Sequence, residues 1–162
     1  MSTILDEAKT RLQRDFDSPA TEWEYLESLF RKSEVERLPL LKWVFEQSPA
    51  YWDTRAHAGK ILLQDDEMET WQSLKNLVAS ADPDDNGTAL TLFESLGDPR
   101  GIELAQDWLN DGAHPVTQIE AINFLKDIYP ERARLRVQAL QNHEDSNIRN
   151  AATKLAAELK AS

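Results

Sequence analysis

A short pattern recurs four times along this chain of 162 residues, at a nearly constant interval. Each copy begins with a polar residue and carries an alanine three positions later. The four pairs are Arg55 and Ala58, Asn86 and Ala89, Gln118 and Ala121, and Arg149 and Ala152, and the polar residues are 31, 32 and 31 positions apart. A period near 31 residues is typical of helical-repeat proteins, in which one supersecondary unit stacks on copies of itself.

Each repeat is predicted to contain two antiparallel helices, which we call helix A and helix B. The last repeat is the clearest. Pro130 precedes its helix A, residues 142–146 form a polar turn, and apolar residues recur at helical spacing within 148–159. The third repeat begins at Asp98, whose side chain can cap a helix, and Gly112 is expected to end its helix A. The predicted repeats are 34–65, 66–97, 98–129 and 130–160.

The first 33 residues depart from this period, since Glu27 stands where the spacing would place an alanine. The region nevertheless has helical patterns. Residues 4–16 are expected to form one helix, and Thr21 with Glu24 matches a capping box that opens a second. We interpret this pair as a terminal cap, because the end repeat of a solenoid otherwise exposes its apolar face.

The sequence therefore predicts one all-α domain over residues 1–162, a right-handed α-α superhelix of about ten helices with residues 1–33 as its capping pair. The repeated alanine has a packing role in this fold, because a small side chain lets helix B approach the next repeat closely. Pro39, one turn into the first helix A, is expected either to kink that helix or to begin it. Three tryptophans on the apolar stripes of A helices are assigned to the core: Trp43, Trp71 and Trp108.

The net charge of −11 is concentrated in the middle of the chain. Residues 1–64 hold 11 acids and 9 bases, residues 65–127 hold 14 acids and 3 bases, and residues 128–162 hold 4 acids and 6 bases. Such a field attracts basic partners and repels nucleic acid and anionic lipid. A solvated acidic face that keeps the protein soluble is the simpler interpretation. The functional interpretation is that the acidic residues bind a basic protein, and that the chain binds neither nucleic acid nor a membrane.

The chain contains no cysteine, which excludes a disulfide frame, a thiol nucleophile and a thiolate metal site. No apolar run approaches the roughly 20 residues that a membrane span needs. The N-terminal residues lack the basic start and the long apolar core of a secretory signal. These features fit a cytoplasmic protein. No catalytic residue and no cofactor are expected, since no serine or threonine has a base beside it in sequence and no glycine-rich phosphate loop is present.

Residues 143–159 resemble the HEAT-like repeat of the bilin-lyase type, in which an acidic turn precedes a Val/Ile-Arg pair, then alanine, then leucine. Residues 48–62 are a second match. The middle repeats keep the alanine but carry Asn86 and Gln118 in place of the arginine. The resemblance covers roughly residues 34–160 and implies an armadillo-like α-solenoid. Members of that family include bilin lyases, certain DNA glycosylases, deoxyhypusine hydroxylases, adaptors and some bacterial immunity proteins.

The resemblance also implies roles for individual residues. The repeat arginine, here Arg55 and Arg149, usually bonds to acidic turn residues of an adjoining repeat, which makes it structural and not a site for anions. The hydroxylases carry His-Glu pairs just after this arginine, whereas the one His-Glu pair here begins at His143, before it. His57 and His114 occupy different repeat positions, so stacking does not bring them together. No metal site is expected.

The expected partner surface is either the exposed face of the B helices or the acidic middle. Counting from the alanines places on that face Asp53, Ala56, Lys60, Leu63, Asp84, Gly87, Thr91, Val116, Ile119, Asn123, Asn147, Asn150 and Lys154. This mixed, partly apolar surface does not suit a polyanion. Trp52 is added because tryptophan is favoured in binding hot spots. The predicted partner-binding residues are Trp52, Asp53, Lys60, Asp65, Asp66, Asp84, Asp85, Asn123, Asn150 and Lys154.

The function predicted from these features is protein binding without catalysis, as an adaptor or, more specifically, an immunity or inhibitor protein. In the sharper form the acidic middle occupies the basic cleft of a nuclease or a similar toxin. Two alternatives stay open. One is a lyase-like enzyme subunit of the bilin-lyase class, and the other is a protein like the DNA glycosylases, which the acidic charge opposes. A repeat stack with a weak cap can also associate with a second copy.

Overall fold

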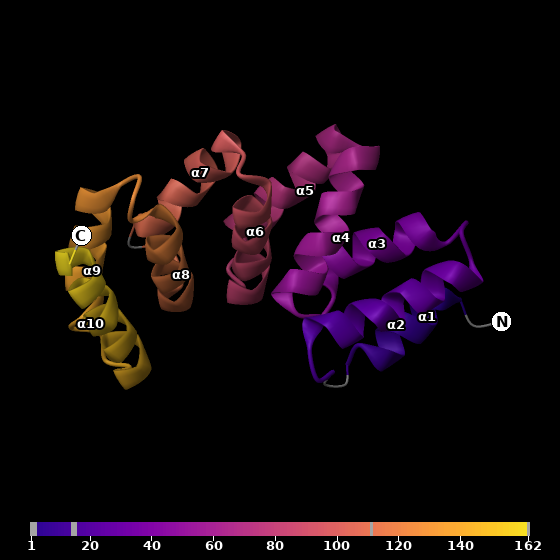
Figure 1. Cartoon of the computed structure of the whole chain (residues 1–162), viewed down its shortest axis with the longest axis horizontal. Coiled ribbons are helices and arrows are strands. Elements are labelled where there is room, and N and C mark those ends of the chain that lie inside the picture. The colour runs from indigo at the N-terminus through magenta and orange to yellow at the C-terminus, as the bar shows by residue number, and fades with distance from the viewer. Residues whose placement is uncertain (1–2, 14–15, 111, 162) are drawn as a thin grey trace. The chain divides into compact units, whose positions relative to one another are not determined.

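The computed structural model describes residues 3–13, 16–110 and 112–161, and these residues form helices and turns with no strand among them. The all-α fold class is therefore confirmed. Figure 1 shows the helices in chain order. Their bounds are α1 Ile4–Arg11, α2 Pro19–Lys32, α3 Arg37–Gln47, α4 Trp52–Asp65, α5 Glu67–Ala79, α6 Pro83–Leu96, α7 Pro99–Ala105, the 3-10 helix η1 Gln106–Leu109, α8 Pro115–Leu125, α9 Pro130–Leu140 and α10 Ser146–Ala161.

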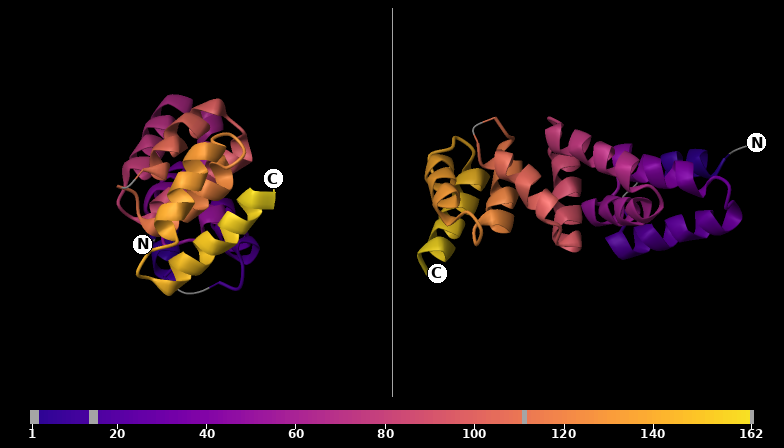
Figure 2. Two further views of the ribbon diagram at one scale, coloured as in Figure 1. Left: turned by 90° about the vertical axis from the view of Figure 1, so that its left-hand side faces the viewer. Right: turned by 90° about the horizontal axis from the view of Figure 1, so that it is seen from above.

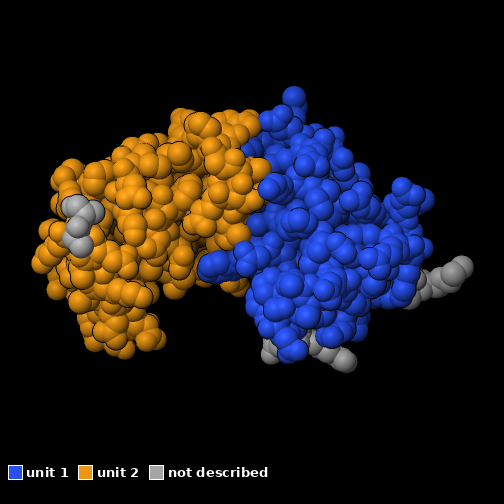
Figure 3. Space-filling view, in the orientation of Figure 1, with its two compact units in different colours: residues 1–77 blue, residues 78–162 orange. Residues whose placement is uncertain are grey.

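The chain divides into two compact units, Met1–Leu77 and Val78–Ser162, which Figure 3 distinguishes by colour. The division falls near the end of α5, inside the predicted second repeat, 66–97. The prediction of a single domain over the whole chain stays a prediction. Each unit has its own hydrophobic core, so each is described by itself.

In the first unit, α3 packs on α4 as a sequential pair, and α2 packs on both α1 and α4. The core between these helices consists of fully buried aliphatic and aromatic side chains, among them Leu26, Leu29, Leu40, Val44 and Phe45. Close packing of such side chains is the main stabilising contribution in a domain of this size. The first helix of the pair therefore covers the apolar side of the second.

In the second unit, α7 with η1 packs on α8, and α9 packs on α10, so two further sequential pairs form. Helix α8 contacts both α6 and α10, the second helix of the following pair. Both views in Figure 2 show the two C-terminal helices against each other. Phe93, Leu92, Ile122 and Leu125 fill the space between these layers. This arrangement is a stack of helix pairs, as the period predicts.

The four repeated alanines are all fully buried. Ala58 lies in the middle of α4, and its counterparts occupy the corresponding turns of α6, α8 and α10. In the second unit one glycine permits a close contact between helices, and another ends a helix. Gly101 lies so near Phe93 that an added Cβ would be 2.5 Å from its Cδ1 atom, and Gly97 ends α6 with a φ of 62°. Glycine tolerates that left-handed conformation without a steric penalty.

The polar residue that begins each repeat pattern donates to main-chain carbonyl groups at the end of its own helix A or in the turn that follows. Arg55 Nε donates to the Phe45 carbonyl at 3.1 Å, and Arg149 Nη1 donates to the carbonyls of His143 and Glu144 at 2.9 and 2.7 Å. The acceptors thus belong to the same pair. The resemblance implies that the acceptor is an acidic side chain of an adjoining repeat, whereas the acceptors in these three bonds are main-chain carbonyl groups.

The neutral residues in the middle repeats make equivalent hydrogen bonds. Asn86 Nδ2 donates to the Val78 and Ser80 carbonyls at 3.3 and 3.1 Å, and Gln118 Nε2 donates to the Ala113 carbonyl at 2.7 Å. Unpaired carbonyl groups at a helix end need such donors. The exchange of arginine for Asn or Gln therefore preserves the structural role of the position.

Several helix boundaries differ from the expected ones. The capping box of α2 is formed by Ser18 and Thr21, one turn before the predicted Thr21–Glu24 box, since Pro19 begins the helix. Helix α1 ends at Arg11 instead of residue 16. Helix α3 begins at Arg37, so Pro39 lies in its first turn, where no main-chain donor is required.

The predicted helix A of the third repeat is interrupted. Asp98 caps α7 as expected, accepting from the Arg100 N–H at 2.9 Å, but α7 ends at Ala105 and continues as the short 3-10 helix η1. Gly112 therefore follows a 3-10 helix and does not end an α-helix.

Some predicted exposures are wrong. Ala56, Gly87 and Ile119, expected on the open face of the B helices, are buried, whereas the equivalent Asn150 is exposed. Of the three tryptophans assigned to the core, Trp108 is buried and the other two, Trp43 and Trp71, are only half-buried. The position after the repeat polar residue thus belongs to the packed face in three repeats.

Candidate functional site

The predicted partner-binding residues are distributed over both units and do not form one site within either. Asp53 and Lys60 are exposed on α4, and Trp52 is half-buried at its start. Asn123, on α8, and Asn150 and Lys154, on α10, are exposed in the second unit. The remaining candidates are Asp65, Asp66 and Asp84, which are exposed, and Asp85, which is half-buried.

Most carboxylates of residues 65–127 are in contact with solvent. The exposed ones are Asp65, Asp66, Glu67, Glu69, Asp82, Asp84, Glu94, Glu103, Asp107 and Asp127. The three bases of the same segment do little to offset them. The Arg100 guanidinium donates to Asp98 at 2.8 Å and lowers the pKa of that carboxyl, while Lys126 pairs with Glu158 at 3.1 Å. The described residues of 65–77 in the first unit and of 78–127 in the second therefore each carry an excess of exposed carboxylates.

Some of these acids also have structural roles. The Asp66 carboxylate accepts from the Glu69 N–H at 3.1 Å, and Asp82 accepts from the Asp84 N–H at 2.9 Å, so each caps the helix that follows. Asp85 accepts from the Ser80 hydroxyl at 2.7 Å. Substitution of these three residues would change stability as well as charge, which makes them poor choices for testing a binding role.

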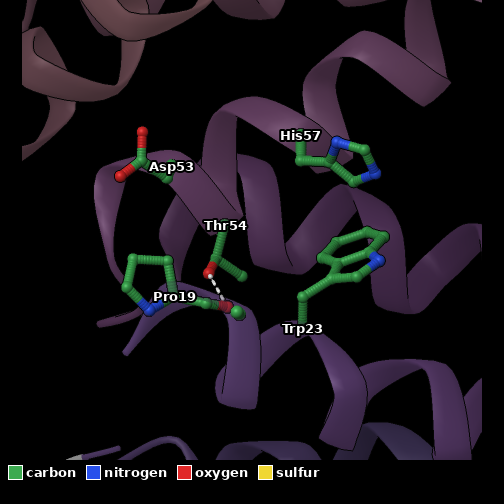
Figure 4. Close-up of a pocket in the computed structure, with 6 residues that line it drawn as sticks. Pro19, Trp23, Asp53, Thr54 and His57 are labelled. Atoms are coloured by element: carbon green, nitrogen blue, oxygen red, sulfur yellow. Dashed lines mark hydrogen bonds between the residues drawn. The ribbon is translucent and has the colours of Figure 1, made fainter. Parts of the chain in front are cut away.

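A small open pocket of about 200 Å³ lies in the first unit, between the starts of α2 and α4 (Figure 4). The Trp23 indole and the His57 imidazole form one wall, with ring centroids 4.3 Å apart and planes nearly perpendicular. Asp53, from the predicted set, lies on the rim, and the Thr54 hydroxyl lies 3.5 Å from the Pro19 carbonyl oxygen. Proximity in sequence could not reveal this group, because Trp23 and His57 come from different helix pairs.

The aromatic wall of the pocket is held in place by neighbouring side chains. The Trp23 indole N–H donates to Glu27 Oε1 at 2.9 Å, and its ring lies 5.9 Å from the ring of Phe30. A hydrogen bond and an aromatic contact together restrict the rotamers of the indole. The pocket is therefore preformed on the aromatic side, although its volume suits a single side chain better than the 300–1,000 Å³ or so typical of small-molecule sites.

A buried carboxylate lies beside this pocket. Glu22, on α2, is almost inaccessible to solvent, and its Oε1 accepts from the Tyr51 main-chain N–H at 3.0 Å. Burial raises the pKa of the Glu22 carboxyl, while hydrogen bonds from the Thr54 side chain and the Tyr51 N–H oppose the rise. The Tyr51 hydroxyl in turn donates to the Phe16 carbonyl at 2.6 Å. These bonds connect α2 to the start of α4.

Among the residues that the structure describes, no group of three or more His, Asp or Glu side chains is placed to hold a metal ion. The same described residues include no helix that is both long enough and apolar enough to cross a membrane. The three histidines lie apart in the chain: His57 is on α4, while His114 and His143 accept main-chain N–H groups through Nδ1 in two different turns.

Apart from Asp53, the residues that line the pocket of the first unit, and Glu22 beside it, were not among the predicted partner-binding residues. The burial of Glu22 could not be recognised from the sequence, because an acidic residue at the polar start of a helix is usually solvated. His114 caps α8 by accepting the Val116 N–H at 3.2 Å through Nδ1, a role that the sequence pattern did not indicate. Comparison of the chain with protein-family models, with curated proteins and with solved structures finds no match.

Proposed function

We propose that this protein is a non-enzymatic, HEAT-like repeat module that binds a basic protein through the exposed carboxylates of residues 65–127. One observation carries the proposal: ten of the 13 acids that the structure describes in that segment are exposed, and two of its three bases are paired with acids. A surface of this kind accelerates association with a positively charged partner. An immunity or inhibitor protein that covers a basic cleft is the specific form that this charge distribution supports.

The test compares two variants with equal changes in charge. The first, Asp65→Asn, Glu103→Gln and Asp127→Asn together, removes three exposed carboxylates of the acidic segment that do not cap a helix. The matched control, Glu24→Gln, Glu34→Gln and Glu144→Gln together, removes three exposed carboxylates outside it. Each purified protein is used to capture partners from the source organism's lysate at low and high salt, with quantitative mass spectrometry.

We expect a basic protein to be captured by the wild type and by the control variant at low salt, and to be lost at high salt because screening weakens the attraction. The acidic-segment variant should capture it about tenfold less, if each lost rim contact contributes about 0.5 kcal/mol. Capture that is the same for all three proteins would contradict the proposal. A partner retained at high salt would contradict its electrostatic basis.

A further inference from the structure

A second, larger cavity lies in the other unit, inside the acidic segment. Its volume is about 400 Å³, and it opens between the turn after α5 and the turn after η1. Residues 78–81 form one side, η1 with the turn at 112–114 forms the other, and Asn86 completes the lining. The polar side chains of the lining are those of Ser80, Asn86, Asp107, Asn110 and His114.

We propose that this cavity, which we call the turn pocket, binds an arginine side chain of the basic partner. This inference rests on the proposed function and adds a specific contact to it. The Asp107 carboxylate is exposed, and among the described residues it lies in the lining without an ion pair. A second carboxylate, that of Asp85, accepts from the hydroxyl of Ser80, a lining residue, at 2.7 Å. Both favour a cation in the turn pocket.

The available acceptors suit a guanidinium group. The turn pocket is formed where α5 and η1 end. The carbonyl groups of Val78, Ser80 and Ala113 already accept from the side chains of Trp108, Asn86 and Gln118, so the Asp107 carboxylate is the main acceptor for a bound cation. Asn110 adds a side-chain oxygen, which already accepts from Arg132 at 3.3 Å. His114 offers no acceptor, since its Nδ1 already receives the Val116 N–H. A planar group with several donors can use such dispersed acceptors, whereas an ammonium group acts as a point charge.

The chain itself shows a preference for guanidinium at these helix ends. Arg132 donates to the Gln106 carbonyl at 3.1 Å, and Arg136 donates to the Leu109 carbonyl at 2.8 Å, both in η1. Arg55 and Arg149 do the same in the first and last repeats. In the second repeat the corresponding donor to the end of helix A is the neutral Asn86. The turn pocket thus lies at a helix-A end that carries Asn where two other repeats carry arginine.

One side of the turn pocket, η1, is held in place by a buried tryptophan. The Trp108 indole N–H donates to the Val78 carbonyl at 3.2 Å, and Trp108 is almost fully buried. This bond fixes η1 against the end of α5. A preformed site loses less conformational entropy on binding than a flexible one. Trp108 also supplies a probe for NMR, because it lines the turn pocket and its indole N–H chemical shift should change when a ligand binds there.

The experiment is a titration of the full-length ¹⁵N-labelled protein with Nα-acetyl-arginine amide, followed by NMR. The matched probe is the citrulline analogue, which has nearly the same shape and no charge. We expect saturable shifts at residues 78–81, 107–110 and 112–114 and at the Trp108 indole, with a dissociation constant of about 1–10 mM. The Asp107→Asn variant should weaken binding about fivefold. The control Glu144→Gln, which removes an exposed carboxylate outside the acidic segment, should leave binding unchanged.

Equal shifts with citrulline, shifts spread evenly over exposed acids, or unchanged binding by the Asp107→Asn variant would each overturn the proposal. The proposed function is tested separately, because its variant leaves Asp107 intact. If the arginine probe does not bind while the Asp65, Glu103 and Asp127 variant still loses partner capture, the turn pocket is wrong and the acidic surface stands. The reverse pattern would reject the acidic surface and show that the turn pocket takes an arginine side chain by itself.

Discussion

Gly101 shows how one missing side chain sets the distance between two helices. A Cβ atom at this position of α7 would lie 2.5 Å from Phe93 Cδ1 and 2.7 Å from its Cγ, closer than nonbonded atoms approach. Phe93 is fully buried, so the contact lies in the core of the second unit. Glycine is therefore required by packing here, not by main-chain conformation.

We expect the Gly101→Ala substitution to destabilise the protein by about 1–3 kcal/mol, because the overpacked core must shift. The measurement is the midpoint of urea unfolding followed by circular dichroism. Gly112→Ala is the control, since an added Cβ there meets nothing within 4 Å. If both variants unfold at the same urea concentration, the close approach of α7 to α6 is not as described.

Glu22 makes a pH-dependent contribution to stability, and the sign follows from the direction of its pKa. Burial raises the folded-state pKa above the ordinary value of 4.5, so the folded protein holds this proton more tightly than the unfolded chain does. The stabilisation is fully present below about 4.5 and is lost as the pH rises through the higher folded-state value.

The Glu22→Gln variant should remove this dependence, since the amide keeps an oxygen for the Tyr51 N–H and cannot ionise. We expect the variant to gain stability relative to the wild type between pH 5 and pH 8, with the difference vanishing near pH 4. Unfolding midpoints measured across that range provide the test, with Glu24→Gln as an exposed control. A constant difference at every pH would show that the carboxyl is not desolvated.

At the scale of the element, the first position of the repeat pattern is arginine in two repeats, and the surroundings of these two arginines differ. Arg55 is fully buried in α4 and donates to the end of α3, whereas Arg149 is exposed at the start of α10 and donates to the preceding turn. The first bond connects the two helices of a pair, and the second connects α10 to the turn that precedes it. Burial, and not the bond itself, should decide how much each side chain stabilises its pair.

We therefore expect Arg55→Ala to cost about 3–5 kcal/mol, because it leaves a cavity and an unpaired carbonyl, and Arg149→Ala only about 0.5–1.5 kcal/mol. Thermal unfolding of the two single variants compares them directly. Equal losses would mean that the depth of the side chain has little influence. A larger loss at Arg149 would reverse our assignment.

The elements also show what sequence reasoning could predict. The period identifies α4, α6, α8 and α10 and their buried alanines, because identical packing demands are repeated at each crossing. It fails where a local interaction competes. Ser18 takes the capping role expected of Thr21, and the chain tightens into η1 after Ala105. The turn pocket and the Glu22 site depend on residues that are distant in sequence, so no spacing could have revealed them.

At the scale of the whole molecule, the acidic segment should make the unbound protein less stable. Exposed carboxylates that outnumber the bases repel one another, and salt screens that repulsion. Asp65, at the end of α4, and Asp127, after α8, also lie near helix ends where a negative charge is unfavourable. A surface kept at such a cost to stability is consistent with selection for binding.

The triple variant at Asp65, Glu103 and Asp127 should accordingly be more stable than the wild type at low salt, by about 0.5–1 kcal/mol, a gain that shrinks as sodium chloride rises from 0.05 to 0.5 M. The control variant at Glu24, Glu34 and Glu144 loses the same charge outside the segment and should gain less. Urea midpoints of the three proteins at both salt concentrations decide the matter. A control that gains as much at low salt would show that net charge, and not its concentration within residues 65–127, sets the repulsion. If the first variant captures less partner and is also more stable, the same carboxylates take part both in binding and in self-repulsion.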